Sequence, residues 1–397
     1  MLIRNNPARL TFFSRAAYLC RAPKERRLGN GGTEMTKTPD EGSVRRVVAR
    51  LPRRAVAHGV SLASAAVVLG SIAGQARAAG GGPFPDHPRW RFVFVNHVTT
   101  NPFFVATQYG IQDACSLLGC TYQWTGSEIS DVAQMVNAMD AAIAGRADAI
   151  AVAIVDPKGF DAPTARALDA GIPVFSYNAD SQPGSPNRRL AYIGQDLFLS
   201  GEMMGERIVT LVGSGEVGIF IATPGQLNLQ PRVDGAIAAI RKSGAPITAT
   251  MIATDPTVNV GLSKIRAYYL GHPQLKGMFG TSGGDTENVG AVMREYDLPK
   301  KGVHGGGFDL LPNSLRAIRD GYLDFAIDQQ PYLQGFYTVM EMFAFKASGG
   351  LVGPADINTG LKFVTRESVT PYLTTKTRYE GSAAAAEIVP RSGPIAG

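Results

Sequence analysis

The sequence predicts an α/β protein built as two lobes, each a doubly wound parallel sheet. Short apolar runs alternate with amphipathic stretches of helical period, which is typical of parallel sheets covered by helices on both faces. This alternation begins at Trp90 and starts again at Glu216. With 397 residues, 45% of them hydrophobic, the chain is long enough for two lobes after a processed segment is removed.

Each lobe is predicted from its own series of strands and helices. In the first lobe we expect strands at 91–95, 120–124, 149–154 and 172–177, and helices at 103–118, 131–143 and 162–170. In the second lobe we expect strands at 216–221, 247–253, 275–280 and 303–308, and helices at 230–243, 258–271 and 285–296. Ligands bind outside the carboxyl ends of the strands in such sheets, so polar residues at those ends are candidates for a site.

The basic residues gather before the predicted lobes. The net charge of the chain is +6, but residues 1–78 hold 14 arginines and lysines against four acidic residues. The remainder of the chain therefore carries a net charge of about −4. The overall positive charge is therefore no argument for a nucleic-acid partner, and we expect none.

Residues 1–78 are predicted to be a leader and an export signal peptide. Arg53 and Arg54 precede an apolar run at 55–73, and Ala76-Arg77-Ala78 matches an A-x-A cleavage site. The arginine pair resembles a twin-arginine signal, although Val56 stands where an aromatic residue or leucine is usual. We therefore expect export to the periplasm by the twin-arginine or the general route; a membrane anchor is the alternative. Met1 and Met35 are both candidates for the start of the chain.

The three cysteines are too few for a disulfide scaffold. A local bridge between Cys115 and Cys120 is conceivable, but five residues along a helix is not a natural bridging distance. We therefore expect free thiols. The chain also has no His/Cys cluster with metal-ligand spacing, so we expect no metal and no cofactor.

Several motifs follow the predicted strands in a recognisable order. They are Asn101-Pro102-Phe103-Phe104, Asn178-Ala179-Asp180, Gln195-Asp196 with Gly201, Pro231-Arg232-Val233-Asp234-Gly235, Gly306-Gly307-Phe308-Asp309 and Asp328-Gln329-Gln330-Pro331. Over about residues 90–375 the chain resembles the ribose- and pentose-binding periplasmic proteins, the substrate-binding proteins of ABC importers. The resemblance implies the type I periplasmic binding fold, in which two doubly wound lobes are joined by a three-stranded hinge.

The resemblance also implies which residues bind the ligand. Asn101 would hydrogen-bond a hydroxyl, Phe103 and Phe104 would sandwich the apolar face of a sugar ring, and Phe308 would add to this contact. Arg232 would be the strongest polar anchor, in an open and wet cleft, with Asp309 and Gln329 completing the polar shell. The remaining candidates are Asn178, Asp180 and Asp255.

Each of these residues also has a purely structural interpretation. Asn101 could cap a helix, the two phenylalanines could belong to the core, Arg232 could be a surface charge, and Asp309 could be a turn residue. His97 is expected to be structural or a rim residue.

The sequence departs from the pentose-binding pattern at three places. Asn178-Ala179 replaces an Asp-Arg pair, and Asp180 is a partial substitute for the lost charge. An aromatic residue is replaced near Thr254-Asp255-Pro256, and Gly284 stands where an asparagine is usual. These departures speak against ribose as the ligand.

Matching the family places the lobe boundaries as follows. The N-terminal lobe is expected at 89–193 plus 330–365, and the C-terminal lobe at 194–329 plus 366–380, followed by a flexible tail at 381–397. The three crossings are expected near 192–196, 328–332 and 364–368.

The resemblance implies a binding protein without catalysis. It would capture a monosaccharide or related polyol between the lobes by hinge closure and deliver it to a membrane ABC permease, as a monomer. A ligand sensor that feeds a chemoreceptor or signalling partner is one alternative. An exported enzyme is another, although the chain has no G-x-S-x-G elbow, no P-loop and only five histidines.

Overall fold

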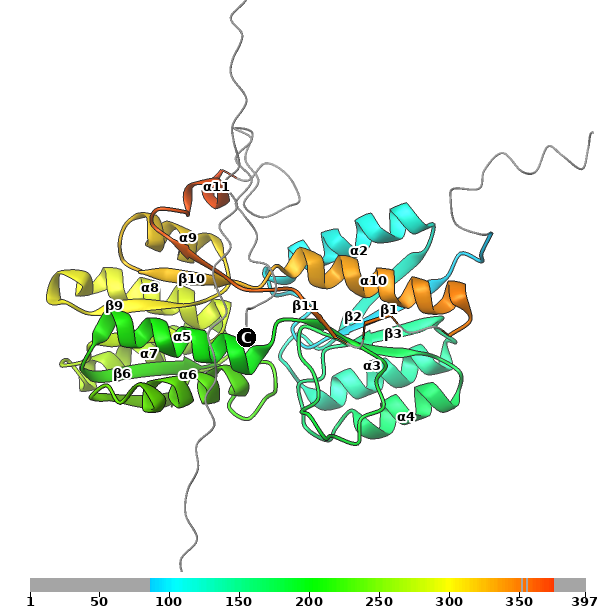
Figure 1. Cartoon of the computed structure of the whole chain (residues 1–397), viewed down its shortest axis with the longest axis horizontal. Coiled ribbons are helices and arrows are strands. Elements are labelled where there is room, and N and C mark those ends of the chain that lie inside the picture. Colours follow the sequence, from blue (N-terminus) through cyan, green and yellow to red (C-terminus); the bar gives the residue numbers. More distant parts are fainter. Residues whose placement is uncertain (1–85, 351–352, 355, 375–397) are drawn as a thin grey trace, which may run out of the picture. The chain divides into compact units, whose positions relative to one another are not determined.

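The computed structural model describes residues 86–350, 353–354 and 356–374 (Figure 1). The predicted leader and signal at 1–78 and the tail at 381–397 lie outside these residues. The described chain forms two α/β lobes, each around its own six-stranded sheet. The predicted architecture of two doubly wound lobes is therefore confirmed.

The sheet of the first lobe is parallel throughout. Its strands, in spatial order, are β11 (Asp356–Asn358), β5 (Tyr192–Gly194), β4 (Val174–Tyr177), β3 (Ala149–Val152), β1 (Arg91–Asn96) and β2 (Thr121–Gly126). Every residue of β3 and β4 is buried, because helices cover both faces of the sheet. Edge strand β2 is only half-buried, in keeping with its open side.

The sheet of the second lobe has one antiparallel edge. Its strands, in spatial order, are β12 (Lys362–Thr365), β10 (Phe325–Asp328), β9 (His304–Phe308), β8 (Gly277–Gly280), β6 (Gly215–Ile221) and β7 (Ile247–Ala253). Only β12 runs antiparallel to its neighbour within this sheet. The predicted central strands of both lobes are present and differ from the predictions at their ends.

The helices follow the same division. Those of the first lobe are α2 (Phe104–Leu118), α3 (Val132–Ala144), α4 (Asp161–Asp169) and α10 (Pro331–Ser348). Those of the second are α5 (Leu197–Val212), α6 (Gln230–Ser243), α7 (Val258–Gly271), α8 (Gly283–Glu295), α9 (Pro312–Arg319), α11 (Thr370–Leu373) and the 3-10 helix η1 (Leu298–Lys301). Asp131 caps α3 as predicted, since its Oδ1 accepts from the backbone N–H of Gln134 at 3.0 Å.

The chain passes between the two sheets three times within the described residues. The first two passages lie between β5 and α5 and between β10 and α10, where they were predicted. The third lies between Asn358 and Lys362, which corrects the expected passage at 364–368 and the boundary at 365. Segment 359–361 connects β11, at the edge of the first sheet, to β12, which pairs with β10 at the edge of the second, so β12 belongs to the second lobe.

Beside each of the first two passages, a glycine lets two helices pack closely. A Cβ atom on Gly201 of α5 would lie 2.3 Å from the backbone oxygen of Arg232 on α6. A Cβ atom on Gly110 of α2 would lie 2.1 Å from the backbone oxygen of Tyr332 on α10. Figure 1 shows α5 alongside α6 and α10 alongside α2. The first contact brings the start of α6, and with it Arg232, close to the hinge.

Two further expectations concern cysteines and membranes. Cys115 and Cys120 are free and buried, as expected, and the N–H of Cys120 donates to the backbone oxygen of Cys115 at 3.1 Å. In the described part of the chain, no helix has both the length and the apolar character needed to cross a membrane.

Candidate functional site

A cavity of about 340 Å³ lies between the two lobes at the carboxyl ends of their strands. Eight of the ten predicted ligand-binding residues line it: Asn101, Phe103, Phe104, Asn178, Arg232, Asp255, Asp309 and Gln329. Asp180 and Phe308 do not. Among the described residues no group of three or more His, Cys, Asp or Glu side chains is arranged to hold a metal ion.

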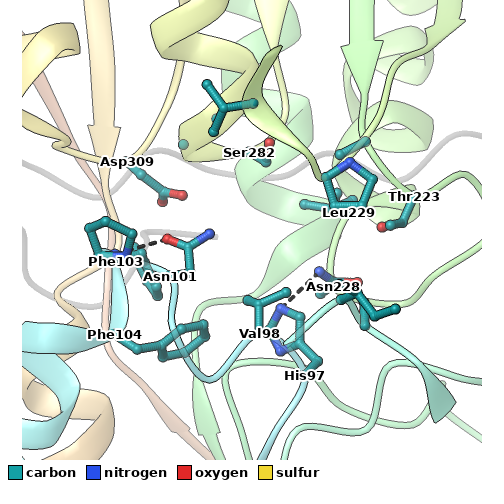
Figure 2. Close-up of a pocket in the computed structure, with 18 of the residues that line it drawn as sticks. His97, Val98, Asn101, Phe103, Phe104, Thr223, Asn228, Leu229, Ser282 and Asp309 are labelled. Carbon is teal, nitrogen blue, oxygen red and sulfur yellow. Dashed lines mark hydrogen bonds between the residues drawn. The ribbon is translucent and has the colours of Figure 1, made fainter. Parts of the chain in front are cut away.

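Asn101 is positioned by a turn between β1 and α2. Its Oδ1 accepts from the N–H of Phe103 at 3.0 Å, and its backbone oxygen accepts from the N–H of Phe104. The side-chain oxygen therefore holds the turn before the helix, whereas the N-cap of α2 is Phe103, so Asn101 does not cap the helix as the structural interpretation expected. Figure 2 shows the amide nitrogen on the other side, turned toward the cavity. Asn101 can thus hold the turn and donate to a ligand at once.

The two adjacent phenylalanines have different environments. The centroids of their rings are 4.8 Å apart, and the ring planes are nearly perpendicular, at 89° to each other. Phe104 is buried in the core of the first lobe and contacts the ring of Trp124. Phe103 is half-buried at the edge of that core. Phe103 therefore offers more of its surface to a bound molecule.

Arg232 lies in the first turn of α6 and is buried, with 3% of its surface exposed. This burial corrects the expectation of an open, wet cleft around it. Its Nη1 donates to the backbone oxygen of Thr281 at 2.8 Å, and its guanidinium lies over the ring of Phe308. Burial lowers the pKa of Arg232, and the negative charge of Asp309 opposes this effect.

Asp309 follows β9 in a left-handed backbone conformation, with φ of 75°. Its Oδ1 accepts from Nε2 of Gln329 at 2.6 Å. Burial raises the pKa of Asp309, while Arg232 and the hydrogen bond from Gln329 act against that rise. Arg232, Asp309 and Gln329 thus form one polar group on the second lobe and the adjoining passage.

Asn178 and Asp255 come from opposite lobes. Asn178 follows β4 with φ of 64°, and its Nδ2 donates to Oε1 of Gln334 at 3.1 Å. Asp255 follows β7, where its Oδ1 accepts from the N–H of Thr257 and its Oδ2 lies 3.6 Å from Nζ of Lys264. These contacts, the backbone hydrogen bond first, lower the pKa of Asp255. Asp255 is therefore ionised at the rim of the cavity.

Two predicted residues have other surroundings. Asp180 is ion-paired with Arg189 and accepts from Oγ of Ser176 at 2.6 Å. It lines a different pocket, together with Gln195 and Asp196 of the first passage. Phe308 is fully buried in the second-lobe core, beneath Arg232. Phe308 therefore does not line the cavity itself but packs under Arg232, which does. Asp180 does not take the place, inside the cavity, of the Asp-Arg pair that this sequence lacks.

Sequence reasoning missed a contact between the lobes at the edge of the cavity. His97, expected to be structural or at the rim, is buried and lines the cavity. Its Nε2 lies 3.3 Å from Nδ2 of Asn228, as Figure 2 shows. Burial, followed by the charge of Arg232, lowers the pKa of His97 to about 3, so this ring is neutral. Asn228 stands in the segment 222–229 between β6 and α6, and this position after the carboxyl end of a strand was the signal that could have indicated it.

The charges that line the cavity are unequal in number. Arg232 is the one cation among the lining residues, whereas Glu128, Asp255 and Asp309 are carboxylates. Hydrogen-bonding groups such as Asn101, Asn178 and Gln329 are interleaved with aromatic rings. This combination suits a neutral ligand with several hydroxyl groups and an apolar face.

Comparison with known proteins places the chain among binding proteins. Residues 92–349 match the periplasmic binding protein domain. The chain is 50% identical over 316 residues to the xylose/arabinose-binding protein XylF of Sulfolobus acidocaldarius, covering 77% of this chain and 78% of that protein.

Solved structures agree with this match. An ABC transporter solute-binding protein of Burkholderia graminis in complex with D-arabinose is 29% identical with a TM-score of 0.67, covering 73% of this chain and 99% of that one. Another, from Agrobacterium vitis and bound to α-D-tagatopyranose, is 26% identical with a TM-score of 0.65, covering 71% and 96%. The chain belongs to the periplasmic binding protein domain family.

Proposed function

We propose that this protein is the exported solute-binding component of an ABC importer and that it binds a neutral monosaccharide, in first place an aldopentose such as xylose or arabinose. The ligand is held in the cavity between the lobes, which close on it by bending at the three passages. The protein carries out no chemical step on the ligand.

The observation that carries this proposal is the composition of the cavity wall. A sugar hydroxyl both donates and accepts a hydrogen bond, and the wall offers acceptors at Asp255 and Asp309 and donors at Asn101 and Arg232. A single buried guanidinium among three carboxylates disfavours an anionic ligand. The ring of Phe103 offers an apolar surface to the C–H groups of a sugar.

The choice of an aldopentose is supported by the relatives. XylF, half of whose aligned residues are identical to this chain, is named for xylose and arabinose, and the Burkholderia protein contains D-arabinose. The replacement of the Asp-Arg pair by Asn178-Ala179 speaks against ribose. An ABC permease as partner is supported by the name of the Burkholderia protein. Export is supported by the arginine pair and cleavage site that precede the first lobe.

Titration calorimetry tests the ligand class with matched pairs of compounds. D-xylose, L-arabinose and D-arabinose are each compared with the corresponding aldonate, an open-chain anion in which C1 is oxidised to a carboxylate and the other hydroxyl groups are kept. D-ribose, D-tagatose and myo-inositol extend the series. We expect binding of at least one neutral pentose and none of its aldonate. In a thermal unfolding assay, the bound pentose should stabilise the protein by about 2.7 kcal/mol at a hundredfold excess over its Kd.

Binding of aldonates with no binding of neutral sugars would overturn the proposed ligand class. Preferred binding of D-ribose would overturn the interpretation of Asn178-Ala179 while leaving the class of function intact. Turnover of any of these sugars, measured by NMR of the ligand after prolonged incubation, would contradict a role limited to binding.

A further inference from the structure

A continuous line of hydrogen-bonded side chains links the two lobes through the second passage. Nε2 of Gln329 donates to Asp309, Nε2 of Gln334 donates to Oε1 of Gln329 at 3.1 Å, and Nδ2 of Asn178 donates to Oε1 of Gln334 at 3.1 Å. All four side chains are more than nine-tenths buried, and Gln334 is fully so. Gln334 lies on α10 and does not line the cavity.

The orientation of the Gln334 amide is fixed at two acceptors. Its Nε2 also donates to the backbone oxygen of Gln329 at 3.2 Å, and a carbonyl oxygen can only accept. Oε1 of Gln334 must therefore face Asn178. At the other end of the line, the carboxylate of Asp309 accepts from Gln329, which turns Oε1 of Gln329 toward Gln334. The backbone oxygen of Gln329 and the carboxylate of Asp309, which can only accept, therefore require the same donor-to-acceptor order along the line.

This direction determines what Asn178 can present to a ligand. Because Oε1 of Gln334 accepts, the amide nitrogen of Asn178 must face Gln334. Oδ1 of Asn178 is then directed away from that bond. The hydrogen bonds that Asn178 makes with other described residues involve its Nδ2, its backbone N–H and its backbone oxygen. Asn178 lines the cavity and is held in a left-handed backbone conformation at the end of β4.

We propose that Gln334 is a positioning residue that fixes the polarity of Asn178, so that Asn178 presents its oxygen to a hydroxyl group of the bound sugar. The inference rests on the proposed function and deepens it. A carboxylate at position 178 would offer an acceptor in either orientation, whereas an amide offers one only when its direction is fixed. Asn178 therefore requires a partner such as Gln334 to orient its amide, whereas an aspartate at this position would require none.

Replacement of Gln334 by methionine tests this inference. Methionine is similar in size and apolar, so it removes all three hydrogen bonds of the Gln334 side chain without burying a charge. The Asn178 amide can then turn either way. We expect Gln334→Met to weaken D-xylose and L-arabinose binding about five- to tenfold, as for the loss of one oriented hydrogen bond. Thr338→Val, which alters another buried polar side chain on the same helix, is the matched control and should leave the affinity within about twofold.

A second substitution separates positioning from general packing. In the otherwise unchanged protein, Asn178→Asp places a carboxylate oxygen against Oε1 of Gln334 and should weaken binding. In the Gln334→Met background the same substitution should restore affinity, because a carboxylate needs no orienting partner. A role of Gln334 in packing alone would give no restoration, and equal losses in both backgrounds would overturn the inference.

The hydrogen-bonded line can also be examined without any ligand. In the unliganded protein the side-chain NH₂ groups of Asn178, Gln329 and Gln334 should exchange with solvent far more slowly than a free amide, by ¹⁵N-resolved hydrogen exchange. Gln334→Met should abolish this protection at Asn178. If the protein binds no sugar, the proposed function is wrong, but the exchange measurement still tests whether Gln334 fixes the orientation of the Asn178 amide. Free-amide exchange at Asn178 in the unchanged protein would overturn the inference by itself.

Discussion

The guanidinium of Arg232 lies over the ring of Phe308, with its central carbon 4.0 Å from the ring centroid. The arginine projects from α6 and the phenylalanine from β9, so the stacking joins two elements of the second lobe. Together with the hydrogen bond to Thr281, it holds the planar fork in place before a ligand arrives. A group held in this way loses little conformational freedom on binding.

Replacement of Arg232 by lysine should therefore reduce both affinity and stability. Lysine cannot reproduce the planar fork or stack flat over Phe308. We expect sugar binding to weaken by more than tenfold, about 1.4 kcal/mol, in titration calorimetry. The melting temperature of the unliganded protein should also fall, since Arg232 is buried. Arg241→Lys, at an exposed position on the same helix, is the control, and unchanged affinity in Arg232→Lys would contradict the assignment of the cavity.

The two phenylalanines at the start of α2 should respond differently to alanine. Phe104 is 2% exposed and belongs to the core, so Phe104→Ala should lower the free energy of unfolding by about 3 to 5 kcal/mol. Phe103 is half-buried, so Phe103→Ala should mainly weaken sugar binding with a smaller loss of stability. Urea unfolding and calorimetry on both variants measure this difference. Equal stability losses with unchanged affinity would assign both rings to the core.

His97 should make the protein less stable in acid. Its pKa is about 3 in the folded protein and about 6.5 in the unfolded chain, so below pH 6.5 the unfolded chain binds a proton that the folded protein does not. The contribution of neutral His97 to the free energy of unfolding is therefore fully present above about pH 6.5 and is lost as the pH falls toward 3. Between pH 7 and pH 5 the loss from this residue should be about 2 kcal/mol.

A comparison with His97→Gln isolates this effect from others. Burial raises the pKa of Asp285 to about 6, so this carboxyl group acts in the opposite direction and adds stability as the pH falls below 6. Asp285 is present in both proteins and cancels in their difference. Urea unfolding at pH 7 and pH 5 should show a larger loss in the unchanged protein than in His97→Gln. Equal losses would mean that His97 is protonated in the fold.

The sequence was sufficient for the repeating strand–helix units because each central strand is a short apolar run buried on both faces. It was insufficient where tertiary contacts decide. The three-residue strands β5 and β11 carry no periodic signal, and only the pairing of β12 with β10 shows that β12 belongs to the second sheet. Among the candidate residues, a motif placed Asn101 and Arg232 at the cavity, but only the fold shows that Arg189 pairs with Asp180. Gln334 lies inside a helix and has no local signal at all.

The loop that follows β6 makes several contacts with the first lobe. Both polar atoms of the Gln226 amide bond Ser130: Oε1 accepts from its Oγ at 2.7 Å, and Nε2 donates to its backbone oxygen at 3.1 Å. The N–H of Leu227 donates to the backbone oxygen of Val155 at 2.8 Å, and its side chain is buried among first-lobe core residues. These contacts join the two lobes beside the cavity, in the arrangement that a bound ligand would favour.

Leu227→Ala should therefore weaken the binding of every sugar by a similar factor, about tenfold, because it removes apolar burial from the closed arrangement rather than a contact with one ligand. If the unliganded protein opens, the Leu227 side chain leaves the first-lobe core, and its loss should barely change the unliganded melting temperature. Leu270→Ala, at an exposed position on α7, is the control. A lowered unliganded melting temperature with unchanged affinity would show that the loop stays attached to the first lobe when the protein is empty. X-ray scattering with and without a saturating sugar should show the accompanying closure, and identical curves would contradict it.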